Sequence, residues 1–369
     1  MRFARRLGLG LLLGCCLAGL AGLAGFAGLA GPARVAELPG AEWSSISPKE
    51  AGGREEELAR ARAYADEIGS SAVVIVQHGK IVAAWGDIAR RFELNSVRKS
   101  LLNALIGIAV AERKIDPMAS LAALGIDDNP PALTAEEKTA RVIDLLRARS
   151  GVYHPALYET AAMAARRPPR GSHAPGSFWY YNNWDFNALG TIYERAVHES
   201  IFVAFDRLIA RPIGMEDYRP SDGRYVRGAA SLMPAYAFHM SARDLARFAL
   251  LYLDGGRWGD ERIVPEDWIK ESTVAYSKSA SGPGYGLLWW TGPLAAGHGN
   301  QMPLPPGSFF ARGYGGQFAF VLPPLDMVVV HLMDLAGRDR ELPLHKMARL
   351  LWFILHAAGS KDIPAAPPD

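Results

Sequence analysis

The chain has 369 residues, of which 49% are hydrophobic and 21% are charged, and its formal net charge is +2. This composition excludes a disordered chain and is typical of a globular protein with an extensive core. The nearly balanced charge, without a basic stripe, argues against nucleic acid as a partner. We therefore expect a small molecule as the ligand.

The first part of the chain differs from the rest. Arg2, Arg5 and Arg6 precede an uncharged run over residues 7–33 that is rich in Leu, Gly and Ala. We predict a signal peptide here, and hence export to the periplasm or the medium. A retained membrane anchor ranks second, because the run exceeds the roughly 20 residues that span a bilayer. Lipidation at Cys15 ranks third, and residues 34–53 are expected to form a linker.

Cysteine and histidine usage limits the chemistry of the folded body. Both cysteines, Cys15 and Cys16, lie in the leader, so disulfides, thiol nucleophiles and Cys-ligated metals are excluded after it. None of the nine histidines pairs with another at the spacing of H-E-x-x-H. We predict neither a metal nor another cofactor.

Hydrophobic periodicity and turn residues predict the secondary structure in chain order. Helices are expected at 55–68, 101–111, 142–147, 184–197, 201–208, 242–253 and 343–356, with a long loop at 167–172. Strands are expected at 72–77, 80–85, 285–290, 309–322 and 327–332. The middle of the chain, about 100–280, is expected to be helix and loop.

This order of elements predicts an α+β fold. Helix and strands occur at both ends, so the simplest architecture is one antiparallel sheet built from both termini and flanked by helices. A mainly helical lobe would complete the domain, with the cleft between the two. We predict a catalytic domain over 54–358, with a sheet lobe at 54–95 and 281–358 and a helical lobe at 96–280. Residues 359–369 would form a tail.

The tetrad Ser96-Val97-Arg98-Lys99 precedes the predicted helix at 101–111. On a helix, Lys99 lies one turn beyond Ser96 on the same face, so its amine can reach the hydroxyl. A lysine can serve as the base only if burial and positive potential keep it neutral, and a helix N-terminus supplies such potential. Spacing alone slightly favours a helix cap beside a solvated lysine. No other lysine of the chain, however, has a serine three residues before it.

Two further segments follow the tetrad in a recognisable order. Residues 144–151 carry D-L-L-x-x-x-S-G, and Tyr181-Asn182-Asn183 forms Y-x-N with its usual flanks. Together the three segments resemble the serine β-lactamase and penicillin-binding-protein superfamily over about residues 60–355. The resemblance is closer to its class C-like esterase and amidase branch, which includes 6-aminohexanoate-dimer hydrolases.

The resemblance implies a β-lactamase/D,D-peptidase-like fold and assigns roles to the motif residues. Ser96 would be the nucleophile, Lys99 its base and Tyr181 the proton shuttle, with a pKa pulled down by the neighbouring lysine ammonium. Asn183 would bind substrate or hold the lysine. The alternative for Tyr181 is a packed aromatic side chain, since its neighbours are rich in aromatic residues.

The third motif of the superfamily, K-T-G or H-T-G, is absent from the chain. Trp290-Thr291-Gly292 imitates it but ends one strand too early. The segment 312–317 resembles the G-x-x-G-Q hairpin of the amidase branch, so Tyr314, Gly315, Gly316 and Gln317 would bind substrate and bring an N–H to the oxyanion. The alternative is a plain glycine hairpin. In β-lactamases the cation of this motif helps to hold a carboxylate of the substrate. The loss of the motif therefore argues against β-lactams as substrates, unless Arg312 supplies the cation.

The sequence therefore predicts an exported serine hydrolase that cleaves an ester or a linear amide through a Ser96 acyl-enzyme. No G-x-S-x-G elbow supports the α/β-hydrolase route to the same chemistry. Two alternatives stay open. One is a β-lactamase or D,D-peptidase acting on β-lactams or peptidoglycan, and the other is a non-catalytic penicillin-sensing or cell-wall-binding module.

Overall fold

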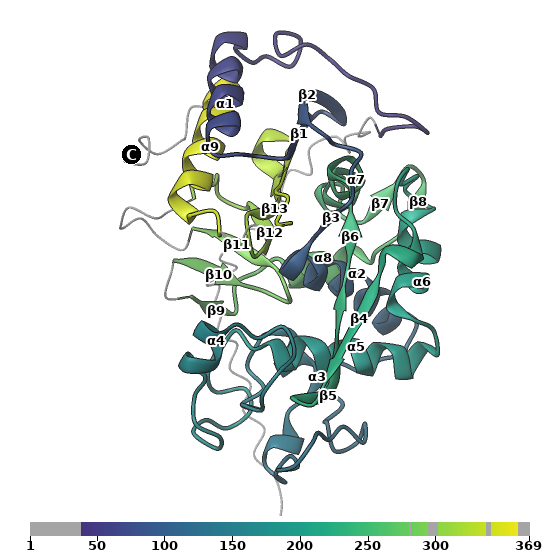
Figure 1. The fold of residues 1–369 in the computed structure, drawn as a ribbon. Coiled ribbons are helices and arrows are strands. Elements are labelled where there is room, and N and C mark those ends of the chain that lie inside the picture. Colours follow the sequence, from purple (N-terminus) through teal and green to yellow (C-terminus); the bar gives the residue numbers. More distant parts are fainter. Residues whose placement is uncertain (1–37, 280–281, 294–301, 337–340, 361–369) are drawn as a thin grey trace, which may run out of the picture. The chain divides into compact units, whose positions relative to one another are not determined.

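The computed structural model describes residues 38–279, 282–293, 302–336 and 341–360 (Figure 1). All of them fall in one unit of the chain, Ala36–Asp369, whereas the other unit, Met1–Val35, lies outside the described residues. The predicted leader is therefore not described. Among the described helices, none is both long enough and apolar enough to cross a membrane.

The centre of the fold is an eight-stranded antiparallel sheet in the order β2-β1-β14-β13-β12-β11-β10-β9. The inner strands β1, β13 and β14 are buried along their whole length, which explains their continuous apolar sequences. In chain order the strands are β1 (Ala72–Gln77), β2 (Lys80–Gly86), β9 (Ser277–Lys278), β10 (Pro283–Tyr285), β11 (Trp290–Pro293), β12 (Phe309–Gly313), β13 (Gln317–Leu322) and β14 (Met327–Leu332).

Helices cover both faces of this sheet. Because side chains alternate along a strand, Val73 and Ile75 of β1 face one layer and Val74 and Val76 the other. The first layer consists of α1 (Glu55–Glu67) and α9 (Leu344–Ala357), which lie side by side in Figure 1. The opposite layer begins with α7 (Ala242–Leu253), which packs on β1, β13 and β14.

The remaining helices form the rest of the α7 side. Helix α2 (Arg98–Ala111) lies at its centre, with residues 98–109 all buried, and it packs against α5 (Asn183–Val197) and α6 (Ile201–Phe205). A 3-10 turn, Asn95–Val97, leads directly into α2. The other helices are α3 (Val142–Leu146), α4 (Ala161–Arg166) and α8 (Glu266–Ser272).

The α+β architecture with an antiparallel sheet from both ends of the chain is confirmed. The single strand predicted at 285–290 is wrong, because β10 and β11 are separate strands joined by a turn at 286–289. Leu288 in this turn has a left-handed backbone, with φ of 61°. The turn is itself buried, so its apolar residues continue the pattern of a strand. The predicted strand 309–322 likewise divides, into β12 and β13.

Several strands occur where helix and loop were expected. The hairpin of β4 (Arg224–Gly228) and β5 (Ser231–Ala237) packs on α5, and Pro234 within β5 disguises it, since proline is rare inside strands. Shorter strands are β3 (Phe92–Glu93), β6 (His239–Met240), β7 (Arg257–Trp258) and β8 (Glu261–Arg262). The predicted lobe boundaries near residues 96 and 280 stay predictions.

Candidate active site

Ser96 is positioned by a short strand and a tight turn. Strand β3 pairs with β6, and Leu94 continues this contact by donating its N–H to the Phe238 carbonyl at 2.9 Å. Asn95 then adopts a left-handed backbone, with φ of 49°, which asparagine tolerates better than most residues. The chain turns there into the 3-10 turn, and Ser96 is left half-buried just before α2.

The structure brings Ser96, Lys99 and Tyr181 together. Lys99 Nζ lies 2.7 Å from Ser96 Oγ and 2.7 Å from the Tyr181 hydroxyl, within hydrogen-bond distance of both. Lys99 itself is only 2% exposed. The expected arrangement of the tetrad along one helix face is thus present, and the solvated lysine of the helix-cap alternative is not. The catalytic roles of the three side chains stay predictions.

Burial determines the protonation state of Lys99. Loss of hydration lowers the pKa of its ammonium well below the usual value, and the charge of the neighbouring Arg98 lowers it further. A neutral amine has a lone pair, so it can accept the proton of Ser96. The shift is in the direction that a lysine base requires, and the role of Lys99 as the base stays a prediction.

Tyr181 differs from expectation in its acidity. Burial raises the pKa of the phenol above its usual value, although the hydrogen bond with Ser96 and the charges of Arg98 and Arg312 act in the opposite direction. The expected lowering assumed a lysine ammonium beside the phenol, and the buried Lys99 does not supply that charge. Tyr181 is consequently a neutral phenol, able to donate one proton while it accepts another.

Aromatic side chains hold Tyr181 in place. Trp290 stacks on its ring with centroids 5.5 Å apart, and the rings of Phe186 and Tyr285 lie 4.9 Å and 5.9 Å away. Lys99 Nζ lies 4.5 Å from the Tyr181 centroid and 4.6 Å from that of Phe186. These ring faces can stabilise an ammonium once Lys99 has taken a proton.

Asn183 follows Tyr181 by two residues, and its side chain is turned toward a loop. It is 4% exposed, and its Nδ2 donates to the Tyr158 carbonyl at 2.5 Å. Its Oδ1 is buried and has no hydrogen-bond partner among the described residues. Substrate binding by Asn183 stays a prediction.

The sequence analysis missed Asp185, which connects two of the motifs. Its Oδ1 accepts hydrogen bonds from Ser150 Oγ at 2.5 Å and from Asn182 Nδ2 at 3.0 Å. Burial raises the pKa of this carboxyl well above its usual value, although the hydrogen bonds from Ser150 and Asn182 act in the opposite direction. Asp185 thereby joins the S-G end of one motif to the Y-x-N turn that carries Tyr181. In the sequence, the only sign of this role is that an acidic residue lies within a helix that is buried on most sides.

The end of β12 lies directly against the turn that carries Ser96. A Cβ atom on Gly313 would stand 2.4 Å from the Leu94 carbonyl oxygen and 3.1 Å from Ser96 N, so no side chain fits there. Asn95 Nδ2 donates to the Tyr314 carbonyl at 3.1 Å. Tyr314 itself is 38% exposed. This placement brings the hairpin backbone next to the Ser96 amide, as an oxyanion hole requires.

The other predicted hairpin residues face the sheet. Gly315 and Gly316 have φ of 85° and 105°, and an added Cβ would meet Leu335 and Met333 at 2.4 and 2.9 Å. Gln317 is fully buried: its Nε2 donates to the Met333 carbonyl at 2.8 Å, and its Oε1 accepts from Met333 N at 2.9 Å. The Gln317 amide thus fixes the hairpin to the chain after β14, and substrate binding by Gln317 stays a prediction.

His331 of β14 supports the same hairpin. Its Nδ1 lies 2.6 Å from the Gly316 carbonyl and its Nε2 lies 2.8 Å from Ser70 Oγ. Because a carbonyl only accepts, Nδ1 carries the proton and Nε2 accepts from the serine. A fully buried side chain on β14 thus anchors the backbone beside Ser96.

Arg312 does not replace the cation of the missing third motif. Along β12, Ala311 faces the α7 side of the sheet, whereas Phe310 belongs to the core beneath α1 and α9. Alternation places Arg312 on the latter face. There its guanidinium lies 3.2 Å from Glu341 and 6.0 Å from the Phe318 ring.

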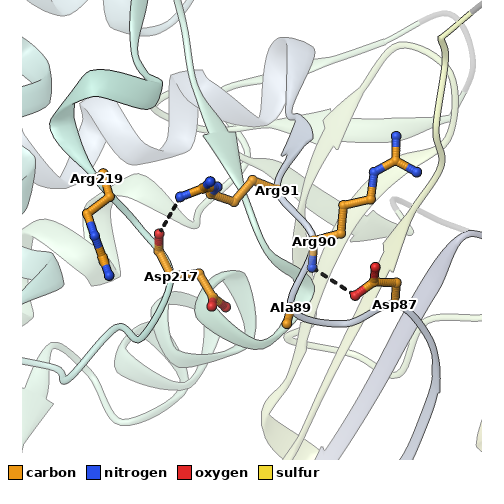
Figure 2. Close-up of a pocket in the computed structure, with 6 residues that line it drawn as sticks. All are labelled: Asp87, Ala89, Arg90, Arg91, Asp217 and Arg219. Atoms are coloured by element: carbon orange, nitrogen blue, oxygen red, sulfur yellow. Dashed lines mark hydrogen bonds between the residues drawn. The ribbon is translucent and has the colours of Figure 1, made fainter.

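A charged pocket of about 560 Å³ lies elsewhere in the fold (Figure 2). The backbone N–H of Arg90 donates to Asp87 Oδ1 at 3.1 Å, and Arg91 Nη1 donates to the Asp217 carbonyl at 3.2 Å. Its lining residues are Asp87, Ala89, Arg90, Arg91, Asp217 and Arg219. None of these is a serine or threonine, so the pocket lacks a hydroxyl nucleophile. Over the described ranges, no group of His, Cys, Asp and Glu side chains could hold a metal ion.

Comparison with known proteins identifies the family. The family model described as Beta-lactamase matches residues 56–351. The chain belongs to the beta-lactamase family. Members of this family are generally serine hydrolases, and the resemblance inferred from the motifs is confirmed. No curated protein sequence matches the chain.

Solved structures show the same fold at low sequence identity. A Bacillus anthracis protein assigned as a 6-aminohexanoate-dimer hydrolase has 18% identity and a TM-score of 0.62, with 88% of each chain covered. A beta-lactamase from Mycobacterium bovis has 21% identity and a TM-score of 0.57, covering 78% of this chain and 95% of that one. The octameric penicillin-binding protein homologue from Pyrococcus abyssi has 17% identity and a TM-score of 0.58, covering 84% and 79%.

The buried His331 predicts a specific pH dependence of stability. Burial lowers its pKa from 6.5 to about 4. Between these values the unfolded chain binds the extra proton, so the contribution of His331 is complete above about pH 6.5 and disappears as the pH falls to about 4. The difference corresponds to about 3 kcal/mol.

We expect the free energy of unfolding of the wild type, relative to His331→Gln, to fall by this amount between about pH 7 and pH 4. Urea unfolding of both proteins across this range measures the difference, and other titrating groups cancel in the comparison. A gap that stays constant with pH would show that His331 is not held neutral.

Proposed function

We propose that this member of the beta-lactamase family is an exported serine hydrolase that cleaves an ester or a linear amide. The observation that carries the proposal is the position of the buried Lys99 amine, 2.7 Å from both the Ser96 hydroxyl and the Tyr181 hydroxyl. A nucleophile, a neutral base and a proton donor then form one connected chain, which acyl transfer requires.

The first chemical step follows from this geometry. Ser96 Oγ attacks the substrate carbonyl carbon while its proton passes to the lone pair of Lys99 Nζ. The carbonyl π bond opens, and its oxygen becomes the oxyanion of a tetrahedral intermediate. The N–H of Ser96 and one N–H of the adjacent hairpin at 313–317 stabilise this oxyanion. The aromatic rings of Tyr181 and Phe186 stabilise the lysine ammonium.

The second step expels the leaving group. As the bond from carbon to the alcohol oxygen or the amine nitrogen breaks, Tyr181 gives its proton to the departing atom and recovers one from Lys99. The products are the free alcohol or amine and an ester on Ser96. Water then attacks this acyl-enzyme by the reverse sequence of proton transfers and releases the acid.

The surroundings of the hairpin favour neutral acyl groups. A substrate carboxylate needs a cation facing the nucleophile, and β12 offers Gly313 at that face, while Arg312 lies on the other and is near Glu341. A β-lactam or a peptidoglycan stem, each with such a carboxylate, would find no partner from this strand. Esters and linear amides without an anionic group have no such requirement.

Ser96 labelling tests the catalytic assignment. We expect a fluorophosphonate probe to label the wild type, Ser96→Ala to remain unlabelled, and Lys99→Ala to react at least about 100-fold more slowly because the base is lost. Mass spectrometry of the labelled peptide gives the site, and circular dichroism controls for folding. Equal labelling of wild type and Ser96→Ala would refute the proposal.

Substrate class is tested by comparing a p-nitrophenyl ester, a short linear amide and a chromogenic cephalosporin on the same enzyme. We expect kcat/KM to be highest for the ester or the amide and lowest for the cephalosporin, because its carboxylate lacks a cationic partner. A preference for the cephalosporin would favour the β-lactamase alternative. No turnover and no acylation by any of the three would favour a non-catalytic sensing or binding module.

Export is part of the proposal and rests on the sequence of residues 7–33. We expect the mature protein, recovered from the periplasm or the medium of the expressing cells, to begin near residue 30. N-terminal sequencing measures this directly. A protein that begins at Met1 and sediments with membranes would instead indicate the retained anchor.

A further inference from the structure

Arg98, between the serine and the lysine of the tetrad, is an unusual buried cation. It is 2% exposed, and its Nη2 donates to Asn187 Oδ1 at 3.1 Å. Its guanidinium carbon lies 4.1 Å from the Tyr236 ring centroid and 5.5 Å from that of Tyr158. Each of these groups is neutral, so they hold the guanidinium without cancelling its charge.

No carboxylate forms an ion pair with Arg98 in the described part of the chain, and its Nη1 has no hydrogen bond of normal geometry there. Arg247 provides the comparison within the same protein. It is equally buried, yet it lies 3.2 Å from Glu216 Oε1 and donates to three backbone carbonyls. Burying a charge without a partner is costly, and an apolar side chain of similar size would avoid this cost. A charged residue at such a costly position has the properties of one whose charge serves the function of the protein.

The charge of Arg98 acts on the Ser96–Lys99–Tyr181 group. Arg98 precedes Lys99 in α2, and its field reaches both the lysine amine and the Tyr181 phenol. We propose that Arg98 is a positioning residue for acyl transfer, whose unpaired charge keeps Lys99 unprotonated and ready to accept the Ser96 proton. The inference rests on the proposed function, since it assumes that Lys99 is the base.

The other titratable groups nearby do not take over the role of Arg98 in keeping Lys99 unprotonated. Tyr236 of β5 and Tyr285 of β10 stay neutral because burial raises the pKa of both phenols. Burial likewise raises the pKa of the Asp185 carboxyl of α5 well above its usual value. Arg312 of β12 is near Glu341 on the far face of the sheet, and its charge acts on Tyr181. Burial is the larger cause of the lowered pKa of Lys99, and Arg98 adds the second.

The pH dependence of acylation tests the inference. A p-nitrophenyl ester is used as the probe, and the acid limb of kcat/KM reports deprotonation of the base in the free enzyme. In Arg98→Met, which conserves bulk without charge, we expect this limb to move up by about 1–2 pH units. At pH values below the wild-type limb the rate should fall about 10- to 100-fold, and it should recover at high pH.

A matched pair of variants tests the charge without removing Arg98. Asn187→Asp gives the guanidinium a carboxylate partner and should move the limb upward in the same way. Both variants lose the hydrogen bond that Asn187 Nδ2 donates to the Leu157 carbonyl at 3.0 Å. Asn187→Leu also loses the one from Arg98 but adds no charge, so its limb should stay at the wild-type position. The comparison of the two Asn187 variants tests the effect of the Arg98 charge even if Arg98→Met does not fold.

Two results would overturn the inference. One is a rate for Arg98→Met that is reduced by the same factor at every pH, which indicates packing alone. The other is an identical limb in Asn187→Asp and Asn187→Leu. Failure of the proposed function would differ from both, because wild type and Ser96→Ala would then react alike with the ester at all pH values.

Discussion

Burial of the Lys99 amine is the constraint on which the rest of the site depends. Only a desolvated lysine is neutral near pH 7, and only a neutral lysine can take a proton from Ser96. The fold achieves this burial by placing α2 in the centre of the helical layer, where its first twelve residues are inaccessible to solvent. The same burial raises the pKa of Tyr181 and keeps the phenol protonated. One physical effect therefore prepares a base and an acid side by side.

The sheet contributes the opposite wall of the site. Gly313 allows β12 to approach the Ser96 turn, and the absence of a Cβ is the condition for that approach. Behind the hairpin, His331 and Gln317 bind the backbone of Gly316 and Met333, so the segment beside the nucleophile is held from its far side. Preorganised backbone donors are effective because they need no rearrangement during the reaction. The buried polar side chains of β13 and β14 thus hold the hairpin backbone beside Ser96.

Much of the fold was predictable because hydrophobic periodicity is a local property. The strands at 72–77 and 327–332 and the helix at 242–253 were predicted with the bounds that the structure shows. The errors occur where burial is not local. The turn at 286–289 is buried and so resembles a strand, and the hairpin of β4 and β5 contains a proline. Such segments are determined by what packs on them.

The site could be predicted as a set of residues but not as an environment. The order of Ser96, Lys99 and Tyr181 along the chain pointed to acyl transfer, and the structure brings the three side chains together. The lowered pKa expected for Tyr181 is wrong, because burial raises it. The side-chain directions of Gln317 and Arg312 likewise depend on packing between distant segments. Arg98, Asp185 and His331 escaped notice because the importance of a buried charge or hydrogen bond lies in its neighbours.

The sequence by itself indicated the family, through the resemblance of its motifs, and the α+β class, through hydrophobic periodicity, and both are confirmed. Only the tertiary structure decided that Lys99 is buried, that Arg98 forms no ion pair with a described carboxylate and that Gly313 lies against Ser96. Solvation and charge compensation arise between segments far apart in the chain, and no local pattern of residues encodes them.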